Sequence, residues 1–81
     1  MKVKTQLENI ALRLNDGVNM DWNDRNQIKH GIFYDYGQKS LRLGDCLDNK
    51  YEETYCLSLD FKDVAIREIG EERLLKYFKG E

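Results

Sequence analysis

Apolar side chains recur near the start of the chain at the spacing of one helix face. Five of them stand at offsets of 0, 4, 7, 8 and 11 residues, which is one stripe of a 3.6-residue period. Asn15-Asp16-Gly17 follows, and Gly17 suits the left-handed residue just past a helix end. The pattern therefore predicts a helix over residues 3–15. The stripe consists of Val3, Leu7, Ile10, Ala11 and Leu14.

The middle of the chain has the composition and alternation of β-strands. Its segments are rich in β-branched and aromatic residues or carry leucines at alternating positions. Residues 36–39 predict a tight turn with a positive φ at Gly37, and a second turn is expected over 48–50. Short turns between successive strands predict an antiparallel meander. The expected strands are 28–36, 40–47 and 54–57.

The helical period returns after the strands. Ser58 is the expected N-cap of a helix whose apolar stripe runs to Ile69, and Gly70 interrupts it. A last helix is expected from Glu71 to Lys79, with acidic residues at its start and basic residues at its end, as the helix dipole favours. The predicted order is α-β-β-β-α-α. This is an α+β domain whose three-stranded meander is covered on one face by helices.

Composition narrows the class of protein. Residues 1–81 are 41% hydrophobic and 35% charged and contain no proline, which fits one small globular domain and excludes a disordered tail. With a net charge of -2, the chain lacks the excess of basic residues that binding to nucleic-acid phosphates requires. No apolar run approaches the roughly 18–20 residues that span a bilayer, and the start of the chain has no secretory pattern. We therefore expect a cytoplasmic protein with no membrane partner.

Few residue types that carry chemistry are present. Cys46 and Cys56 are expected to be reduced thiols, although one disulfide between them is the alternative. Together with the single histidine, His30, they are too few for a structural zinc site. If Gly37 and the next residue form a two-residue turn, His30 faces Asp45 with no nucleophile beside it. The dispersed glycines form no phosphate-binding loop, so we expect neither catalysis nor a cofactor.

The same register divides the sheet residues between two faces. On the face left open by the helices, Phe33 is opposite Arg42, and interfaces favour both residue types. The alternative is that the loop containing Trp22 covers Phe33. The residues expected on the helix-covered face are His30, Ile32, Tyr34, Leu41, Leu43, Tyr55 and Leu57. Those expected on the open face are Lys29, Gly31, Phe33, Asp35, Ser40, Arg42, Gly44 and Cys46.

Three segments carry a family resemblance. Asp21-Trp22-Asn23-Asp24, Tyr34-Asp35-Tyr36 and the run from Ala65 to Phe78, above all Glu68-Ile69-Gly70-Glu71-Glu72-Arg73-Leu74-Leu75-Lys76-Tyr77, resemble small proteins encoded by phages and prophages of Gram-positive bacteria. That family is of unknown function. The resemblance implies a phage origin and the cytoplasm of a bacterial host, and it carries over no catalytic residue.

These observations favour a small, non-catalytic binding protein that engages a host or bacterial defence protein, as anti-CRISPR-type inhibitors do. One alternative is a nucleic-acid-binding accessory factor that uses sheet aromatics, namely Phe33, Tyr34, Tyr36, Tyr51 and Tyr55. Another is capture of a nucleotide signal, and a homodimer that buries the Phe33 face also stays open. The residues expected to contact the protein partner are Phe33, Arg42, Asp35, Lys29, Trp22, Asp21 and Asp24.

Overall fold

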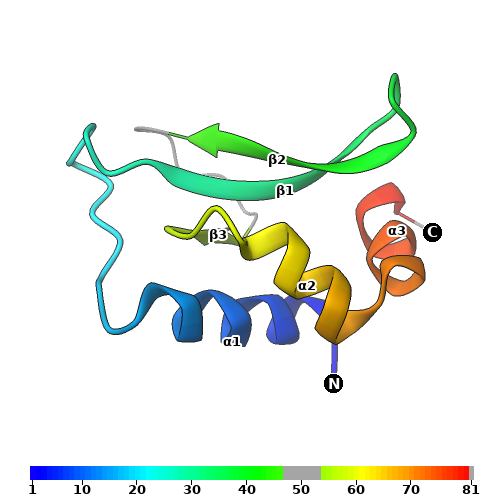
Figure 1. The fold of residues 1–81 in the computed structure, drawn as a ribbon, viewed down its shortest axis with the longest axis horizontal. Helices are drawn as coiled ribbons and strands as arrows, with labels where there is room; N and C mark the ends of the chain where they lie inside the picture. The colour runs from blue at the N-terminus through cyan, green and yellow to red at the C-terminus, as the bar shows by residue number, and fades with distance from the viewer. Residues whose placement is uncertain (47–53, 81) are drawn as a thin grey trace.

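Three helices lie on one side of a three-stranded antiparallel sheet, and the other side of the sheet faces away from them (Figure 1). The computed structural model describes residues 1–46 and 54–80, so the turn predicted over 48–50 lies outside the described residues. The predicted α+β class and order of elements are confirmed. The elements are α1 (Val3–Asn15), β1 (Lys29–Asp35), β2 (Ser40–Cys46), β3 (Tyr55–Cys56), α2 (Phe61–Ile69) and α3 (Glu71–Lys79).

The helix ends follow the sequence pattern with two differences. After α1, the left-handed conformation is adopted by Asp16 (φ 50°) as well as by the expected Gly17 (φ 81°). Ser58 is not the N-cap of α2, which begins three residues later with Asp60 at that position. The Ser58 hydroxyl instead accepts a hydrogen bond from the Asp60 backbone N–H (3.1 Å). Ser58 therefore forms a turn that leads into the helix, since its hydroxyl bonds a backbone group two residues on.

The β1–β2 hairpin has the predicted register along its whole length, from Lys29 opposite Cys46 to Asp35 opposite Ser40. The prediction of a positive φ at Gly37 is wrong, because the left-handed residue of this turn is Lys39 (φ 54°). Asp35 explains the difference. Its carboxylate Oδ1 accepts the backbone N–H groups of Gly37 (2.9 Å) and the following residue (3.1 Å). This Asx-type cap shapes the turn from its first residue.

The sheet is not a meander. Its order is β2-β1-β3, so β3 pairs with β1 and not with its predecessor β2. A meander would have placed β2 in the centre. Two strand spacings, about 10 Å, therefore separate β2 from β3. The central strand is also the one with four successive buried residues, Lys29–Ile32, which is the burial expected of a strand paired on both edges.

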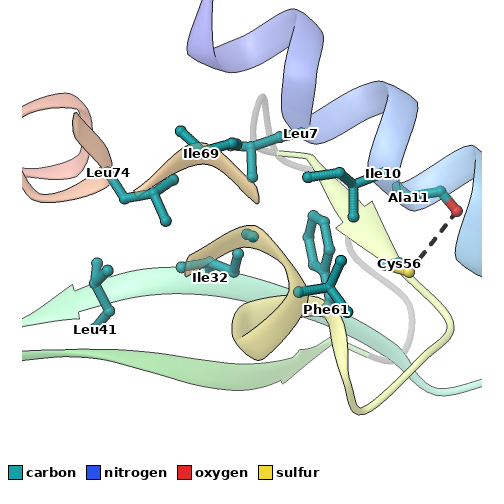
Figure 2. Close-up of a cluster of buried hydrophobic side chains, with 11 residues drawn as sticks. Leu7, Ile10, Ala11, Ile32, Leu41, Cys56, Phe61, Ile69 and Leu74 are labelled. Atoms are coloured by element: carbon teal, nitrogen blue, oxygen red, sulfur yellow. Dashed lines mark hydrogen bonds between the residues drawn. The ribbon is translucent and has the colours of Figure 1, made fainter. Parts of the chain in front are cut away.

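The core lies between the helices and the covered face of the sheet (Figure 2). α2 and α3 pack against β1, while α1 packs against α2 and β3. Phe61 at the start of α2 and Leu74 in α3 are fully buried, so both C-terminal helices contribute to the same cluster. The buried hydrophobic residues are Leu7, Ile10, Ala11, Ile32, Leu41, Cys56, Phe61, Val64, Ala65, Ile69 and Leu74.

A buried asparagine joins the end of α1 to β3. The Asn15 side-chain oxygen accepts hydrogen bonds from the Leu57 backbone N–H (2.8 Å) and the Cys56 thiol (3.2 Å). Replacing Asn15 with alanine leaves both donors without this acceptor, and we expect a loss of about 1–3 kcal/mol in the free energy of unfolding. Urea denaturation followed by circular dichroism measures the loss. The matched control is Asn9→Ala, an exposed position on the same helix, and equal stability of the two variants would contradict this role.

Candidate functional site

The open face of the sheet carries the predicted candidate site. Phe33 projects from β1 with 43% of its surface exposed, opposite Arg42 on β2. Its ring lies over Gly44, where an added Cβ would come within 3.2 Å of the Phe33 ring. Because Gly44 has no side chain, the aromatic ring can lie close to the backbone of β2. Phe33 and Arg42 are therefore cross-strand neighbours on the open face, as the sequence predicts.

Tyr55 belongs to this open face, and its predicted place on the helix-covered face is wrong. Because β3 pairs with β1, Tyr55 is opposite Gly31 and Cys56 is opposite His30. A Cβ at Gly31 would come within 2.7 Å of the Tyr55 ring, so this glycine makes the space that the ring occupies. The next residue, Cys56, points to the covered face instead and is fully buried.

Trp22 extends the aromatic surface from the loop before β1. Its ring meets the Tyr55 ring edge-on, with centroids 5.4 Å apart. Gly31 and Gly44, which lie under the Tyr55 and Phe33 rings, are cross-strand partners, so the two rings cover neighbouring positions. Trp22, Tyr55 and Phe33 are called the aromatic strip below. The Trp22 loop thus adds to this surface and leaves Phe33 partly exposed.

Lys29 is not a surface contact residue, contrary to the sequence prediction. Its side chain is fully buried, and the ammonium donates hydrogen bonds to the backbone oxygens of Asp21 (2.7 Å), Gln27 (2.8 Å) and Asp24 (3.4 Å). The ammonium also lies 5.1 Å from the centre of the Trp22 ring. Three carbonyl groups and an aromatic face replace the water that a lysine normally binds. Lys29 therefore fixes the loop that presents Trp22.

Asp21 and Asp24 shape this loop as well. The Asp21 carboxylate accepts the backbone N–H of Asn23, and the Asp24 carboxylate accepts that of Asn26, both at 2.9 Å. These are two successive Asx turns, which the run of Asn and Asp residues favours. Gln27 closes the loop because its side-chain amide donates a hydrogen bond to the backbone oxygen of Asn19 (3.1 Å). Both aspartates are exposed, so their outer carboxylate oxygens face solvent.

Asp35 and Arg42 lie at the hairpin end of the open face. Their charged groups are 3.9 Å apart, with 29% of the Asp35 side chain and 52% of the Arg42 side chain exposed. The Asp35 carboxylate also caps the hairpin turn, which fixes its position. An exposed ion pair of this length contributes little stability. Arg42 therefore keeps most of its hydrogen-bonding capacity for a partner.

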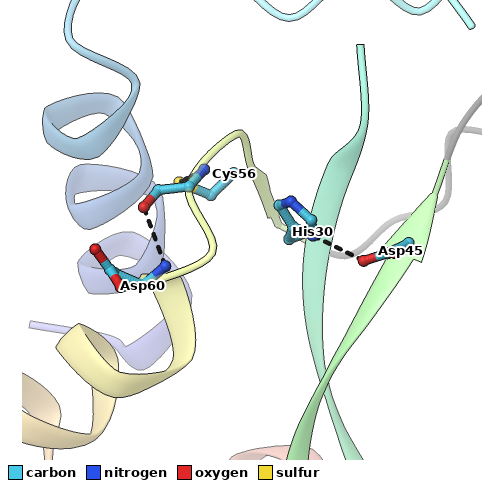
Figure 3. A network of polar contacts seen from close by, with 5 residues as sticks. His30, Asp45, Cys56 and Asp60 are labelled. Atoms are coloured by element: carbon cyan, nitrogen blue, oxygen red, sulfur yellow. Dashed lines mark hydrogen bonds and ion pairs between the residues drawn. The ribbon is translucent and has the colours of Figure 1, made fainter. Parts of the chain in front are cut away.

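Cys56 and the single histidine, His30, are cross-strand neighbours on the covered face (Figure 3). The predicted pair is confirmed, since His30 Nδ1 is 2.8 Å from Asp45 Oδ1. Cys56 is a free thiol, and burial raises its pKa above the ordinary value. A raised pKa disfavours the thiolate that nucleophilic chemistry needs. Cys56 instead donates to Asn15 and packs in the core.

The strand order also bears on the alternative disulfide. β1 lies between β2, which ends at Cys46, and β3, which carries Cys56. Two strand spacings separate their backbones by about 10 Å, beyond the roughly 7 Å that a disulfide bridges. In residues 1–46 and 54–80, no group of three or more His, Cys, Asp or Glu side chains is arranged to hold a metal ion.

The aromatic residues considered for nucleic-acid binding do not form one platform. Only Phe33 and Tyr55 share the open face, and Tyr51 lies outside the described residues. Tyr34 is on the covered face, where its ring meets Tyr36 edge-on at 4.7 Å. The Lys79 ammonium lies 5.4 Å from the Tyr34 ring. These tyrosines therefore form a separate cluster between the hairpin and the end of α3.

A small open pocket of about 190 Å³ lies between α1 and the end of α2. Arg13 and Glu68 line it and form an ion pair with each other, so its two charged groups already have partners. The pocket is lined by Met1 and by residues of α1 and α2, and it is distinct from the aromatic strip on the sheet. It is smaller than the roughly 300–1,000 Å³ typical of ligand sites. The open face is therefore the better candidate site.

Comparison of the chain with models of protein families, with curated proteins and with solved structures found no match. Within the described parts of the chain, none of the helices has the length and apolar character needed to cross a membrane. The candidate site accordingly rests on its own geometry. Sequence reasoning identified Phe33, Arg42 and Trp22 for it but missed Tyr55. The residue that could have indicated Tyr55 is Gly31, because a glycine on the central strand leaves space for a ring from a neighbouring strand. That space is used by Tyr55 because β3 pairs with β1.

Proposed function

We propose that this chain is a non-catalytic domain that binds another protein through the open face of its sheet. The observation that carries the proposal is the half-exposed Phe33 ring lying over Gly44 beside the accessible guanidinium of Arg42. The rest of the aromatic strip extends this surface towards the Trp22 loop. Aromatic and arginine side chains supply most of the energetically dominant contacts in protein interfaces.

The shape and charge of the surface favour a protein over a nucleic acid or a small ligand. Glycines under both rings keep the face shallow, whereas small molecules bind in concave pockets. The net charge of -2 and the exposed carboxylates of Asp21 and Asp24 repel phosphate groups. A partner with an apolar pocket for Phe33 and an acidic group for Arg42 would complement the surface. Basic groups on the partner would suit the two aspartates.

The resemblance to phage-encoded proteins supports a partner in the defence system of the bacterial host. In this proposal the chain acts in the host cytoplasm and inhibits a nuclease-based defence protein, in the manner of an anti-CRISPR inhibitor. The buried Cys56 thiol and the paired His30 favour inhibition by occupancy over inhibition by chemistry. The carboxylates of this chain are too few and too mixed with basic residues for its whole surface to imitate DNA.

The test compares phage plating on bacteria with an active CRISPR-associated nuclease. Expression of the wild-type chain should restore plaque formation, and the double variant Phe33→Ala, Arg42→Ala should lose at least about tenfold of that effect, since each hot-spot residue contributes roughly 2 kcal/mol or more. Leu12→Ala, at an exposed apolar position on α1, is the control and should retain it. Equal activity of the double variant and the Leu12→Ala control would remove the open face from the proposal. If the wild-type chain also fails to restore plaque formation, the proposal of a defence protein as partner is overturned.

Nucleic-acid binding is the alternative function. The Lys79 ammonium over the Tyr34 ring and the exposed Tyr36 beside it are the observations that favour it. A gel shift with single-stranded and double-stranded probes at low salt distinguishes the two. Binding that weakens steeply with salt and is lost in Tyr36→Ala would support this alternative. Nucleotide capture would appear as thermal stabilisation by a nucleotide.

A further inference from the structure

β2 is an edge strand with one unpaired side. The order β2-β1-β3 leaves its outer side without a partner strand among residues 1–46 and 54–80 (Figure 1). In an antiparallel pair, alternate residues direct their backbone N–H and C=O groups away from the neighbouring strand. The seven residues of β2 therefore present a row of unpaired backbone groups. Such a row is a template for another strand.

The two edges of the sheet differ in how far they are protected. β3 is only two residues long, and a short edge strand offers few backbone groups for pairing. β2 has seven residues, contains neither proline nor lysine, and pairs with β1 through seven consecutive partners without a bulge. It therefore lacks three of the features that prevent edge-to-edge pairing, namely proline, lysine and a bulge, although it carries the charged residues Arg42 and Asp45. Within the described parts of the chain, the outer side of β2 is therefore the longer unpaired edge.

We propose that a second copy of this chain occupies that edge, with the two β2 strands antiparallel and a two-fold axis through Leu43. In this register all seven residues of β2 are paired, from Ser40 opposite Cys46 at the ends to Leu43 opposite Leu43 at the centre. Centring the pair on Arg42 would place two guanidinium groups directly opposite each other, which is repulsive. Centring it on Gly44 would leave two residues of each strand unpaired. The Leu43 register alone avoids both costs.

The side chains on both faces fit this register. On the open face, Arg42 of one copy is opposite Gly44 of the other, which has no side chain of its own and has the Phe33 ring beside it. Because the Phe33 ring lies beside that glycine, the incoming guanidinium comes within reach of an aromatic ring, and the face of such a ring attracts cations. On the covered face, the two half-buried Leu43 side chains meet and bury each other. The second copy thus contributes a residue to the candidate site of the first.

The dimer would have a continuous six-stranded sheet, in the order β3-β1-β2-β2-β1-β3, with both aromatic strips on one face. It therefore presents two copies of the open face side by side and does not bury Phe33. This arrangement is independent of which protein the open face binds. It favours a symmetric partner, or one with two equivalent docking points, because linked sites bind with a high effective concentration.

Cross-linking tests the register. The variant Ser40→Cys places a thiol opposite the native Cys46 of the second copy, so mild oxidation should form two symmetric disulfides. Within one chain these positions lie at opposite ends of β2, roughly 20 Å apart, which no disulfide can bridge. The expected product is a covalent dimer of twice 9.6 kDa on a non-reducing gel. Pairing should make it form roughly tenfold faster than random encounter allows.

Two controls separate pairing from chance contact. Lys39→Cys moves the thiol one residue into the exposed turn and should cross-link at the random rate, and S40C/C46S should give no fast product. The native mass of the wild type should be that of a dimer, while circular dichroism confirms that each variant is folded. A monomeric wild type at micromolar concentration overturns the proposal. So does S40C cross-linking no faster than the Lys39→Cys control.

Discussion

Replacing Lys29 with methionine is expected to lower the free energy of unfolding by about 3 kcal/mol. Methionine keeps the apolar stem but removes the ammonium that bonds three backbone carbonyl oxygens. These oxygens lie around a fully buried side chain, so their lost hydrogen bonds are not readily replaced by water. The loop from Asn19 to Ile28 should loosen first, because the ammonium joins its two ends to the sheet.

The single tryptophan reports this change directly. Trp22 lies 5.1 Å from the ammonium, so its fluorescence should change in K29M and its transition in urea should precede the loss of helical circular dichroism. The control is Lys4→Met, an exposed lysine on α1, which should have wild-type stability. A K29M variant as stable as K4M would mean that the buried ammonium has no net effect on the fold.

Replacing Phe61 with alanine should have a still larger effect, a loss of about 3–5 kcal/mol. Phe61 is fully buried at the start of α2, in the cluster that joins α1, α2 and the sheet. Truncation removes the buried ring and leaves a cavity that neighbouring side chains fill only in part. A domain of this length has a total stability of about 4–12 kcal/mol. The F61A protein should therefore be partly unfolded at 37 °C.

Thermal unfolding monitored by circular dichroism measures this effect. Leu59→Ala is the matched control, since Leu59 stands two residues earlier and 72% of its surface is exposed. It should unfold at the wild-type temperature, whereas Phe61→Leu should lie between wild type and F61A because it retains most of the buried volume. If F61A and L59A unfold at the same temperature, Phe61 is not a core residue.

The sequence predicted those parts of the fold that depend on neighbouring residues. The apolar stripe fixes the bounds of α1, because one helix face must be buried. The hairpin register follows from the few residues that separate β1 from β2 in the sequence. Only one turn length fits between them while keeping the apolar residues of both strands on the same face. The position of Phe33 opposite Arg42 follows from this register, so the pair at the centre of the candidate site was predictable from local pattern.

Features that depend on distant residues were not predictable in this way. β3 could pair with either earlier strand, and strand alternation does not reveal which one, so the meander and the face of Tyr55 were both misplaced. Lys29 was expected at the surface because lysine rarely loses its water. Its burial requires three carbonyl oxygens from a folded loop, and backbone groups carry no sequence signal.

The central claim is that the open face contacts a protein partner, and site-directed photo-cross-linking tests it most directly. A benzophenone amino acid in place of Phe33 should, on irradiation in the bacterial host, form a covalent adduct with one defence protein, and Arg42→Ala should reduce its yield. The same probe in place of the exposed Leu12 on α1 should give no such adduct. Adducts of equal yield from both positions, or none from position 33 in a folded chain, would contradict the claim.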